Sequence, residues 1–296
     1  AMANAGNPKT LENRTIYVAN PEYFGVFARR LFKAGINVVG GCCGTTPEHV
    51  RRMANSARML AATNGGLDAE FVDKVKPVTG IETPLEARSD FGARLSRGEF
   101  VTSVELNPPN GLKLEKRIAA AKALEAFGVT TINIADGPRA TLRMGNVAMA
   151  TEIARHTGLS PLVHVCCRDR NYLGLQSHLL GMHVLGLRNV VIITGDPPKM
   201  GPFPHATGVY DVNSIGLLNL VQGFNHGMDA IGQALPDRTE FVCATGAEPA
   251  AHDYDRELKR LEMKVNAGAN VVMTQPVYDP FKVERFLDDV AGLGIP

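Results

Sequence analysis

Apolar and polar positions alternate along this chain in a way that predicts a series of strands and helices. Short apolar runs, most of them about thirty residues apart as in βα units, predict strands over Phe100–Asn107, Thr131–Asp136, Leu162–Cys167, Val190–Asp196, Phe241–Gly246 and Val271–Val277. Every position of Val190–Ile193 is apolar, which is typical of a parallel strand covered on both faces.

The segment after the first strand shows the helical half of the repeat. Leu114, Ile118, Ala121 and Leu124 share one helical face, and Gly128 follows as a stop signal. Six successive βα units favour an α/β fold of the (β/α)8 TIM-barrel type over a doubly wound sheet. Since only six strands are predicted, we expect the last two units to lie outside this chain.

The first sixty residues hold two further helix patterns, beginning at Pro21 and Pro47, and two short strand candidates, Ile16–Ala19 and Ile36–Val39. Adding these two strands would bring the count to eight. We reject that solution because it would place about forty irregular residues inside a barrel. The chain is therefore divided into the tail of one domain (1–62), a linker (63–97) with a helix near Ser89–Ser96, and an incomplete barrel (98–296).

Composition narrows the class of protein. Of the 296 residues, 45% are hydrophobic and the formal net charge is only +1, with no basic block that would suggest nucleic-acid binding. The chain has no apolar run of membrane-spanning length and no signal-peptide layout, so we expect a cytoplasmic protein. Its five cysteines form no secreted disulfide pattern and are expected to be reduced.

Asp196 lies in a Gly-Asp-Pro-Pro turn at the end of a predicted buried strand. The carboxyl ends of parallel strands are where α/β enzymes keep their chemistry. Asp196 is thus a candidate site residue, and the alternative is that it only caps the following turn or helix.

Glu105 is placed by the pattern inside an otherwise apolar strand. Such a carboxyl group must be paired or have a raised pKa, and a raised pKa suits a general acid near neutral pH. The alternative is an ion pair with a neighbouring strand. Gln275, at another strand end, offers a donor and an acceptor to a heterocycle or to backbone groups. His164 is either a site residue or a hydrogen-bonded core histidine.

Cys42 and Cys43 form a vicinal pair in Gly-Gly-Cys-Cys-Gly-Thr, directly before a capped helix. Thiolates suit zinc, and a catalytic zinc keeps three protein ligands; the alternative is two small buried residues. The motif resembles the zinc site of homocysteine S-methyltransferases, and Met2–Arg51 looks like the last segment of that (β/α)8 barrel. The resemblance implies zinc and homocysteine as ligands, with a third cysteine outside this chain.

Three motifs together, VELNPP with Glu105, TGDPP with Asp196 and TQPVYD with Gln275, resemble methylenetetrahydrofolate reductase over Phe100–Pro296. A methyltransferase tail before such a barrel resembles bacterial bifunctional proteins. The resemblance implies reduction of 5,10-methylenetetrahydrofolate to 5-methyltetrahydrofolate by NAD(P)H through FAD, coupled in the intact protein to methionine synthesis, and it is compatible with a homo-oligomer.

The resemblance also implies residue roles. Glu105 matches the general acid, while Asp196 and Gln275 match folate-binding residues. The positions that match FAD contacts are Asp136, His164, Thr194, Gly195, Asp196, Tyr210, Glu257 and Lys264. The chain departs from the usual pattern at Pro276-Val277, where an aromatic pair is expected, and at Ala135-Asp136-Gly137, where Thr-Tyr-Gly is common. Two alternatives are a methyltransferase whose second barrel only binds folate, and a regulatory barrel without turnover.

Overall fold

The computed structural model describes residues 1–3, 5, 9–11, 14–16, 20–36, 38–64 and 82–295. The chain divides into two compact units, Ala1–Lys74 and Val75–Pro296, and each unit is described by itself. Within the described residues, none of the helices combines the length and the apolar character that a membrane crossing requires.

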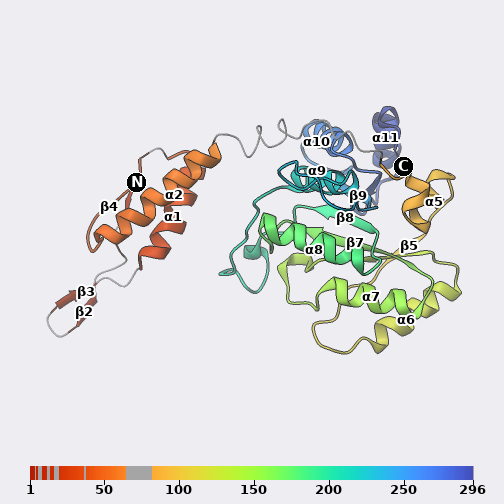
Figure 1. Cartoon of the computed structure of the whole chain (residues 1–296), viewed down its shortest axis with the longest axis horizontal. Helices are drawn as coiled ribbons and strands as arrows, with labels where there is room; N and C mark the ends of the chain where they lie inside the picture. The colour runs from red at the N-terminus through yellow and green to blue at the C-terminus, as the bar shows by residue number, and fades with distance from the viewer. Residues whose placement is uncertain are drawn as a thin grey trace. The chain divides into compact units, whose positions relative to one another are not determined.

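The second unit contains one sheet of six parallel strands (Figure 1). These strands are β5 (Ser103–Glu105), β6 (Thr131–Ile134), β7 (Ser160–Cys166), β8 (Asn189–Ile193), β9 (Val242–Ala247) and β10 (Val271–Thr274). Their order in the sheet is their order in the sequence, and every neighbouring pair is parallel. The predicted strands are therefore confirmed in number and order, although their ends differ by a few residues.

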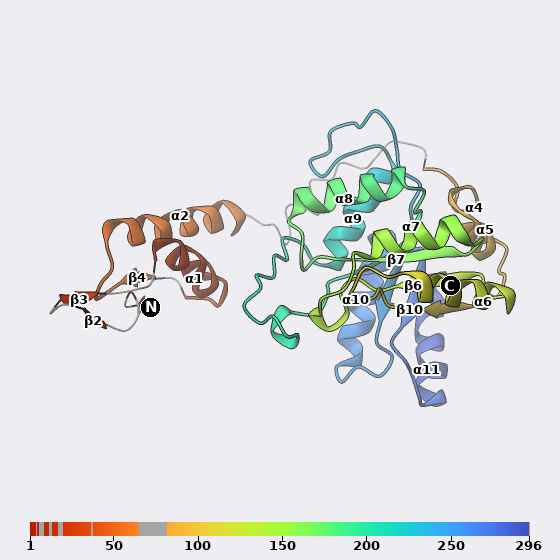
Figure 2. The ribbon, with the colours of Figure 1, turned by 90° about the horizontal axis from the view of Figure 1, so that it is seen from below.

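Helices follow the strands and cover the sheet on its outer face (Figures 1 and 2). They are α6 (Glu115–Ala126), α7 (Asn146–His156), α8 (Tyr172–Val184), α9 (Ser214–Asn225), α10 (Tyr254–Asn266) and α11 (Pro280–Val290), with short 3₁₀ turns η1 (Pro138–Ala140), η2 (Pro198–Met200) and η3 (Ala291–Leu293). The side chains that point outward from β6 to β9 form the main core with α6 to α9. Continuous apolar burial on this face explains why the sequence of these strands is so rich in Ile and Val.

The inner face of the sheet has a separate, smaller core. Val191, Val242 and Val271 cluster with Phe91 of α5 (Asp90–Ser96), which follows the short helix α4 (Leu85–Arg88). All long helices of this unit therefore lie on one face, and α5 covers part of the other. In a doubly wound sheet, long helices would cover both faces and the strand order would reverse. The expected (β/α)8 barrel is thus confirmed in part: the six strands form a curled, parallel half-barrel.

The predicted linker differs from the structure in its second part. The helix expected near Ser89–Ser96 is present as α5, and it packs against the sheet because Phe91 is apolar and 4% exposed. The buried Arg88 guanidinium binds Glu82 at 2.6 Å and donates to the carbonyl oxygen of Phe241 at 3.0 Å. Residues 82–97 are therefore a folded part of the second unit, and residues 65–81 lie outside the described residues.

The first unit is built on two helices, α1 (Pro21–Lys33) and α2 (Pro47–Asn64), which pack against each other. Asn20 caps α1 by accepting a hydrogen bond from the Tyr23 amide at 2.9 Å, as the Asn-Pro start signal predicts. The short strands are β1 (Met2–Ala3) paired with β4 (Gly40–Gly41), and β2 (Lys9–Leu11) paired with β3 (Arg14–Ile16).

The two early strand candidates are only partly right. Of Ile16–Ala19, only Ile16 is described, as the end of β3. The strand expected over Ile36–Val39 is wrong for its described residues, Ile36, Val38 and Val39, since pairing begins at Gly40. Val38 is 76% exposed, so the apolar run there is not a buried strand. None of β1 to β4 pairs with the six-stranded sheet. The described parts of these segments therefore add no strand to that sheet.

Candidate active site

The carboxyl ends of β5, β6 and β7 bring three polar side chains together on the inner face. Glu105 lies opposite Asn133 in the strand register, and His164 Nε2 lies 2.7 Å from Asn133 Oδ1. Because an amide oxygen only accepts, the imidazole is protonated on Nε2. Burial lowers the pKa of His164, against the opposing effect of the Glu105 and Asp136 charges, which favours the neutral ring.

The environment of Glu105 corrects one expectation. The strand predicted over Phe100–Asn107 is only Ser103–Glu105, and Phe100 is 95% exposed. Glu105 is itself exposed, and its Oε1 accepts a hydrogen bond from Asn107 Nδ2 at 3.0 Å. The expected apolar surroundings of Glu105 are therefore wrong for the described residues, because β5 is an edge strand with one open side.

Arg168, two residues beyond the end of β7, connects three strand ends. Its guanidinium is buried, with 4% of the residue exposed, and it donates to both carboxylate oxygens of Asp169 at 2.8 Å. The same group donates to the main-chain oxygens of Asp196 at 3.3 Å and Asp136 at 3.5 Å. The bonds to Asp169 raise the pKa of Arg168 and lower that of Asp169, so both groups are charged.

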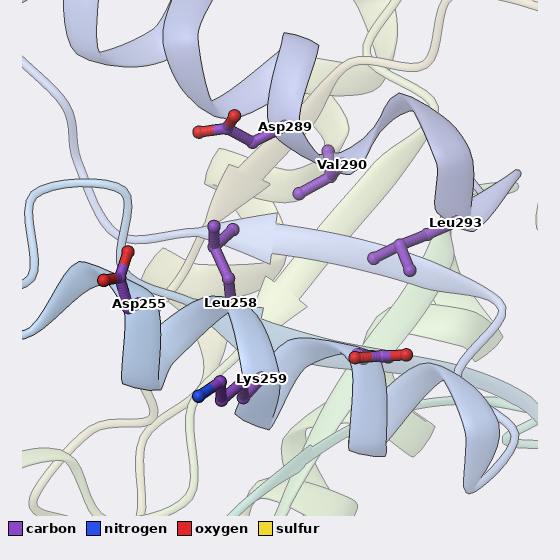
Figure 3. Close-up of a pocket in the computed structure, with 7 residues that line it drawn as sticks. Asp255, Leu258, Lys259, Asp289, Val290 and Leu293 are labelled. Carbon is purple, nitrogen blue, oxygen red and sulfur yellow. The ribbon is translucent and has the colours of Figure 1, made fainter.

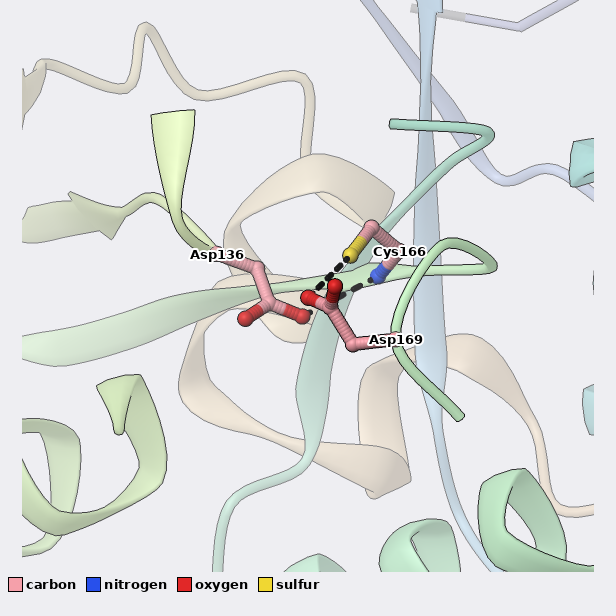
Figure 4. Close-up of side chains that lie close together, drawn as sticks. All are labelled: Asp136, Cys166 and Asp169. Atoms are coloured by element: carbon pink, nitrogen blue, oxygen red, sulfur yellow. Dashed lines mark hydrogen bonds between the residues drawn. The ribbon is translucent and has the colours of Figure 1, made fainter. Parts of the chain in front are cut away.

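Asp136, Cys166 and Asp169 form a compact group near this arginine (Figure 4). One potential ligand atom from each lies within 4.8 Å of the other two. However, burial raises the pKa of the Cys166 thiol to about 12, and Asp136 and Asp169 are paired with Arg170 and Arg168. A protonated thiol and two carboxylates already neutralised by arginine are a poor donor set for a cation, so we assign no metal here.

Asp196 binds a loop other than its own. Its Oδ2 accepts a hydrogen bond of 2.8 Å from the backbone N–H of Arg139, in the loop after β6. That loop needs support, because Gly137, Arg139 and Ala140 all have positive φ angles, of 53°, 55° and 52°. The interpretation of Asp196 as a cap of the next turn is thus replaced by a contact between two strand-end loops.

The residues next to Asp196 are tightly packed. Gly195 has φ of 88°, and a Cβ atom there would lie 2.9 Å from Cys166 Cβ, so only glycine fits. Tyr210 Oη donates to the Gly195 carbonyl at 3.3 Å, and Thr194 Oγ1 accepts from the Ser214 amide at 3.3 Å. The structure therefore brings the predicted residues Thr194, Gly195 and Tyr210 together.

The remaining predicted residues lie at β9, β10 and α10. Lys264 is only 6% exposed, donates to the Gly246 carbonyl at 2.6 Å and lies 4.0 Å from Glu257 Oε1. Burial lowers the pKa of Lys264. Gln275 is exposed just beyond β10, where its backbone N–H donates to the Ala247 carbonyl at 2.8 Å. Gln275 and Glu105 belong to the two opposite edges of the sheet, whereas Asp196 follows β8, inside it.

A cavity of about 350 Å³ opens beside the Arg168 cluster. Its charged lining comes from Asp136, Arg143, Arg168, Asp169 and Arg170, and Phe203 contributes part of its apolar lining. Another hollow, of about 320 Å³, lies between α10 and the end of α11 (Figure 3). It is lined by Asp255, Leu258, Lys259, Glu262, Asp289, Val290 and Leu293. None of the predicted site residues lines this second hollow, so it is not the candidate site.

In the first unit, Cys42 and Cys43 are exposed, and their sulfur atoms lie 3.9 Å apart. Two thiolates bound to one tetrahedral zinc at about 2.3 Å would be separated by about 3.8 Å. The pair thus fits two corners of a zinc site. Among the described residues, no third Cys, His, Asp or Glu completes a cluster with them.

Arg168, Asp169, Arg170 and Asn133 were missed by the sequence reasoning. The signal was present: Arg168-Asp169-Arg170 follows an apolar strand directly, at the same end of the sheet as Asp196. The rule that selected Asp196 would have selected these residues as well. Asn133 gave no such signal, because its role depends on its register opposite Glu105.

The curled parallel sheet with charged groups at its carboxyl edge defines an α/β-barrel type of enzyme. Residues 90–296 match the family model of methylenetetrahydrofolate reductase, and residues 1–57 match that of homocysteine S-methyltransferase. The chain belongs to the methylenetetrahydrofolate reductase family.

Named relatives agree with this family. The 5,10-methylenetetrahydrofolate reductase of Pectobacterium carotovorum subsp. carotovorum is 24% identical over 200 residues, covering 67% of this chain and 62% of the relative. The probable methylenetetrahydrofolate reductase (NADH) of Oryza sativa subsp. japonica is 26% identical over 225 residues, covering 73% of this chain and 35% of the relative. The chain thus spans about three fifths of the bacterial relative and about a third of the plant one.

Proposed function

We propose that the second unit reduces 5,10-methylenetetrahydrofolate to 5-methyltetrahydrofolate with electrons from NAD(P)H and with FAD as cofactor. The observation that carries this proposal is the grouping of Glu105, Asn133 and His164 at adjoining strand ends, in a chain of this family. We further propose that the half-barrel is the larger part of an eight-stranded barrel in the cytoplasm, with β5 and β10 meeting additional strands.

The inner face of the sheet, near the carboxyl ends of its strands, has features that suit a flat, polar cofactor. A Cβ atom built at Gly246 would meet no atom within 4 Å, which leaves open space at the end of β9. Polar groups lie at the same carboxyl ends of the strands, including the neutral His164 ring and the main chain around Thr194 and Gly195. FAD bound there would supply hydride transfer from NAD(P)H to the folate.

The chain's own residues would bind the folate and move one proton. Glu105 is exposed on the inner face, where its carboxyl group can give a proton to the folate nitrogen whose bond to the bridging carbon breaks. Asp196, held by Arg139, would bind the pterin and adjust the charge near the cofactor. Gln275 would pair with the pterin edge through its side-chain amide.

Lys264 and Glu257 match, in the family resemblance, residues that hold the ribose and diphosphate of FAD. The Lys264 ammonium group here is buried against the Gly246 carbonyl. We propose that Glu257 binds the ribose, and that Lys264 contributes its positive charge from below the surface instead of by an exposed contact.

For the first unit, we propose that Cys42 and Cys43 are two of three zinc ligands in a homocysteine S-methyltransferase barrel. The support is the sulfur separation of 3.9 Å and the family match over residues 1–57. A chain that contains the rest of that barrel would supply the third ligand and couple folate reduction to methionine synthesis.

The proposed function is tested by flavin content, followed by anaerobic reduction and reoxidation. The purified chain should bind FAD, be reduced by NADH or NADPH, and be reoxidised by methylenetetrahydrofolate. Glu105→Gln should keep FAD and its reduction by NAD(P)H but lose reoxidation by the folate. A folate-binding barrel without turnover would bind the folate but leave the reduced flavin unchanged. Full-rate reoxidation in Glu105→Gln would show that Glu105 is not the acid.

A further inference from the structure

We infer that Arg168 is the positioning residue of the candidate site, holding the strand ends of β6 and β8 in register and balancing their negative charge. This role rests on the proposed function only where it concerns the cofactor. Arg168 is not among the residues that the family motifs select, and only 4% of it is exposed.

The Arg168 guanidinium joins two strand ends. It donates to the main-chain oxygen of Asp136 after β6 and to that of Asp196 after β8, while Asp169 holds it in place through two bonds of 2.8 Å. A planar group with several donors in a fixed arrangement can make these bonds together, and a lysine ammonium group cannot.

Arg168 also packs closely against the two loops. A Cβ atom at Gly137 would lie 2.7 Å from Arg168 Nη2, and one at Gly195 would lie 3.4 Å from Arg168 Cβ. The arginine therefore lies directly against both glycine-containing turns. Two residues after Gly137, the Arg139 amide donates to Asp196 Oδ2. Arg168 thus supports both partners of that hydrogen bond.

The charge of Arg168 offsets the carboxylates around it. Asp136, Asp169 and Asp196 bring three carboxylates to these strand ends, and Arg170 pairs with Asp136. Arg168 is the most buried charged group among these residues, so little solvent screens its charge. Removing it would leave a more negative site, and removing Asp169 would leave a more positive one.

The first measurement needs no cofactor. Hydrogen exchange of the Arg139 amide in the full chain reports whether Asp196 still holds it. Arg168→Met should make this amide exchange about tenfold faster, the equivalent of one lost hydrogen bond. The Arg256 amide is the control, because it also donates to a carboxylate, Asp253 Oδ1, on a distant element. Its exchange should not change.

Arg168→Lys keeps the charge but loses the planar donor geometry. Exchange of the Arg139 amide should therefore be faster than in the unmodified chain in this variant also, and this variant carries the test if Arg168→Met does not fold. Unchanged exchange of Arg139 in the folded variants would overturn the positioning role.

The second measurement is the reduction potential of the bound flavin. It should become more negative in Arg168→Met, more positive in Asp169→Asn, and stay close to the original value in Arg168→Lys. A purely structural role would move the first two variants in the same direction, and that result would overturn the electrostatic part. If the unmodified chain binds no flavin, the proposed function fails, while amide exchange still decides the role of Arg168.

Discussion

The backbone N–H of Arg139 donates a 2.8 Å hydrogen bond to Asp196 Oδ2, and this bond joins the loop after β6 to the loop after β8. The intervening strand β7 is followed by Arg168, which binds the main chain of Asp196 from another side. A carboxylate that a sequence pattern selects as a site residue is thus also a structural link between loops. The two roles can be separated by experiment.

Replacing Asp196 with Asn or Ala separates them. Asp196→Ala removes the acceptor and should reduce the free energy of unfolding by about 1–2 kcal/mol. Asp196→Asn keeps an acceptor oxygen but not the charge, so its stability should be nearly unchanged while flavin reoxidation by methylenetetrahydrofolate slows about tenfold or more. Denaturant unfolding and stopped-flow absorbance measure the two effects. Reoxidation at the original rate in Asp196→Asn would leave only the structural role.

Gly195→Ala tests the tight turn before Asp196. The new methyl group would adopt an unfavourable positive φ and clash with Cys166, so we expect a loss of about 2–4 kcal/mol in the free energy of unfolding. Gly186→Ala is the matched control, since Gly186 has a φ of 79° but a Cβ atom there would meet nothing within 4 Å. It should lose only about 1 kcal/mol. Equal losses in both variants would contradict the proposed clash.

Arg88→Met tests the buried contact at the opposite end of the sheet. The substitution removes the partner of Glu82 and the donor to the Phe241 carbonyl. We expect a decrease of about 3 kcal/mol in the free energy of unfolding. Arg97→Met is the control, because Arg97 pairs with Glu99 on the surface and is more than half exposed; it should change stability by less than about 0.5 kcal/mol. Similar values for both variants would argue against a structural role for Arg88.

His178 predicts a pH dependence of stability. Burial lowers its pKa to about 4 in the folded chain, helped by the Arg170 charge. The unfolded chain, with a pKa of about 6.5, binds more protons between these two values. Stability should therefore fall as pH decreases from about 6.5 to about 4, by at most about 3 kcal/mol from this residue.

His178→Gln should flatten this part of the pH profile, as measured by urea unfolding at several pH values. His156→Gln is a suitable control, because His156 lies on the surface of α7. An equally steep decline in His178→Gln would assign the pH dependence to other groups.

The sequence predicted the central strands well because β6 to β9 are buried on both sides. The apolar runs of β7 and β8 predicted buried parallel strands, and the spacing of these runs predicted the helix between them. It failed at the edges. β5 is short and half exposed, so the apolar pattern around Phe100 did not reflect burial.

The candidate site was predictable only in part. Position at a strand end selected Asp196 and Gln275, because that rule needs no knowledge of neighbouring strands, whereas Glu105 was selected as a carboxylate inside an apolar run. The connection between Arg168 and the main chain of Asp196 joins residues of different strands, and backbone carbonyls carry no sequence signal. The helix near Ser89–Ser96 was predicted, but the attachment of residues 82–97 to the sheet was not, since Arg88 binds a carbonyl 153 residues later.

The order of the strands has a consequence for how the chain assembles. Each strand of the large sheet pairs only with its predecessor and its successor in the sequence, so the sheet can grow one unit at a time while the polypeptide leaves the ribosome. Arg88 is different, because it must wait for Phe241 to be synthesised before its contact can form. The contact at the end of the sheet where β9 begins is therefore completed late, after most of the strands are already paired.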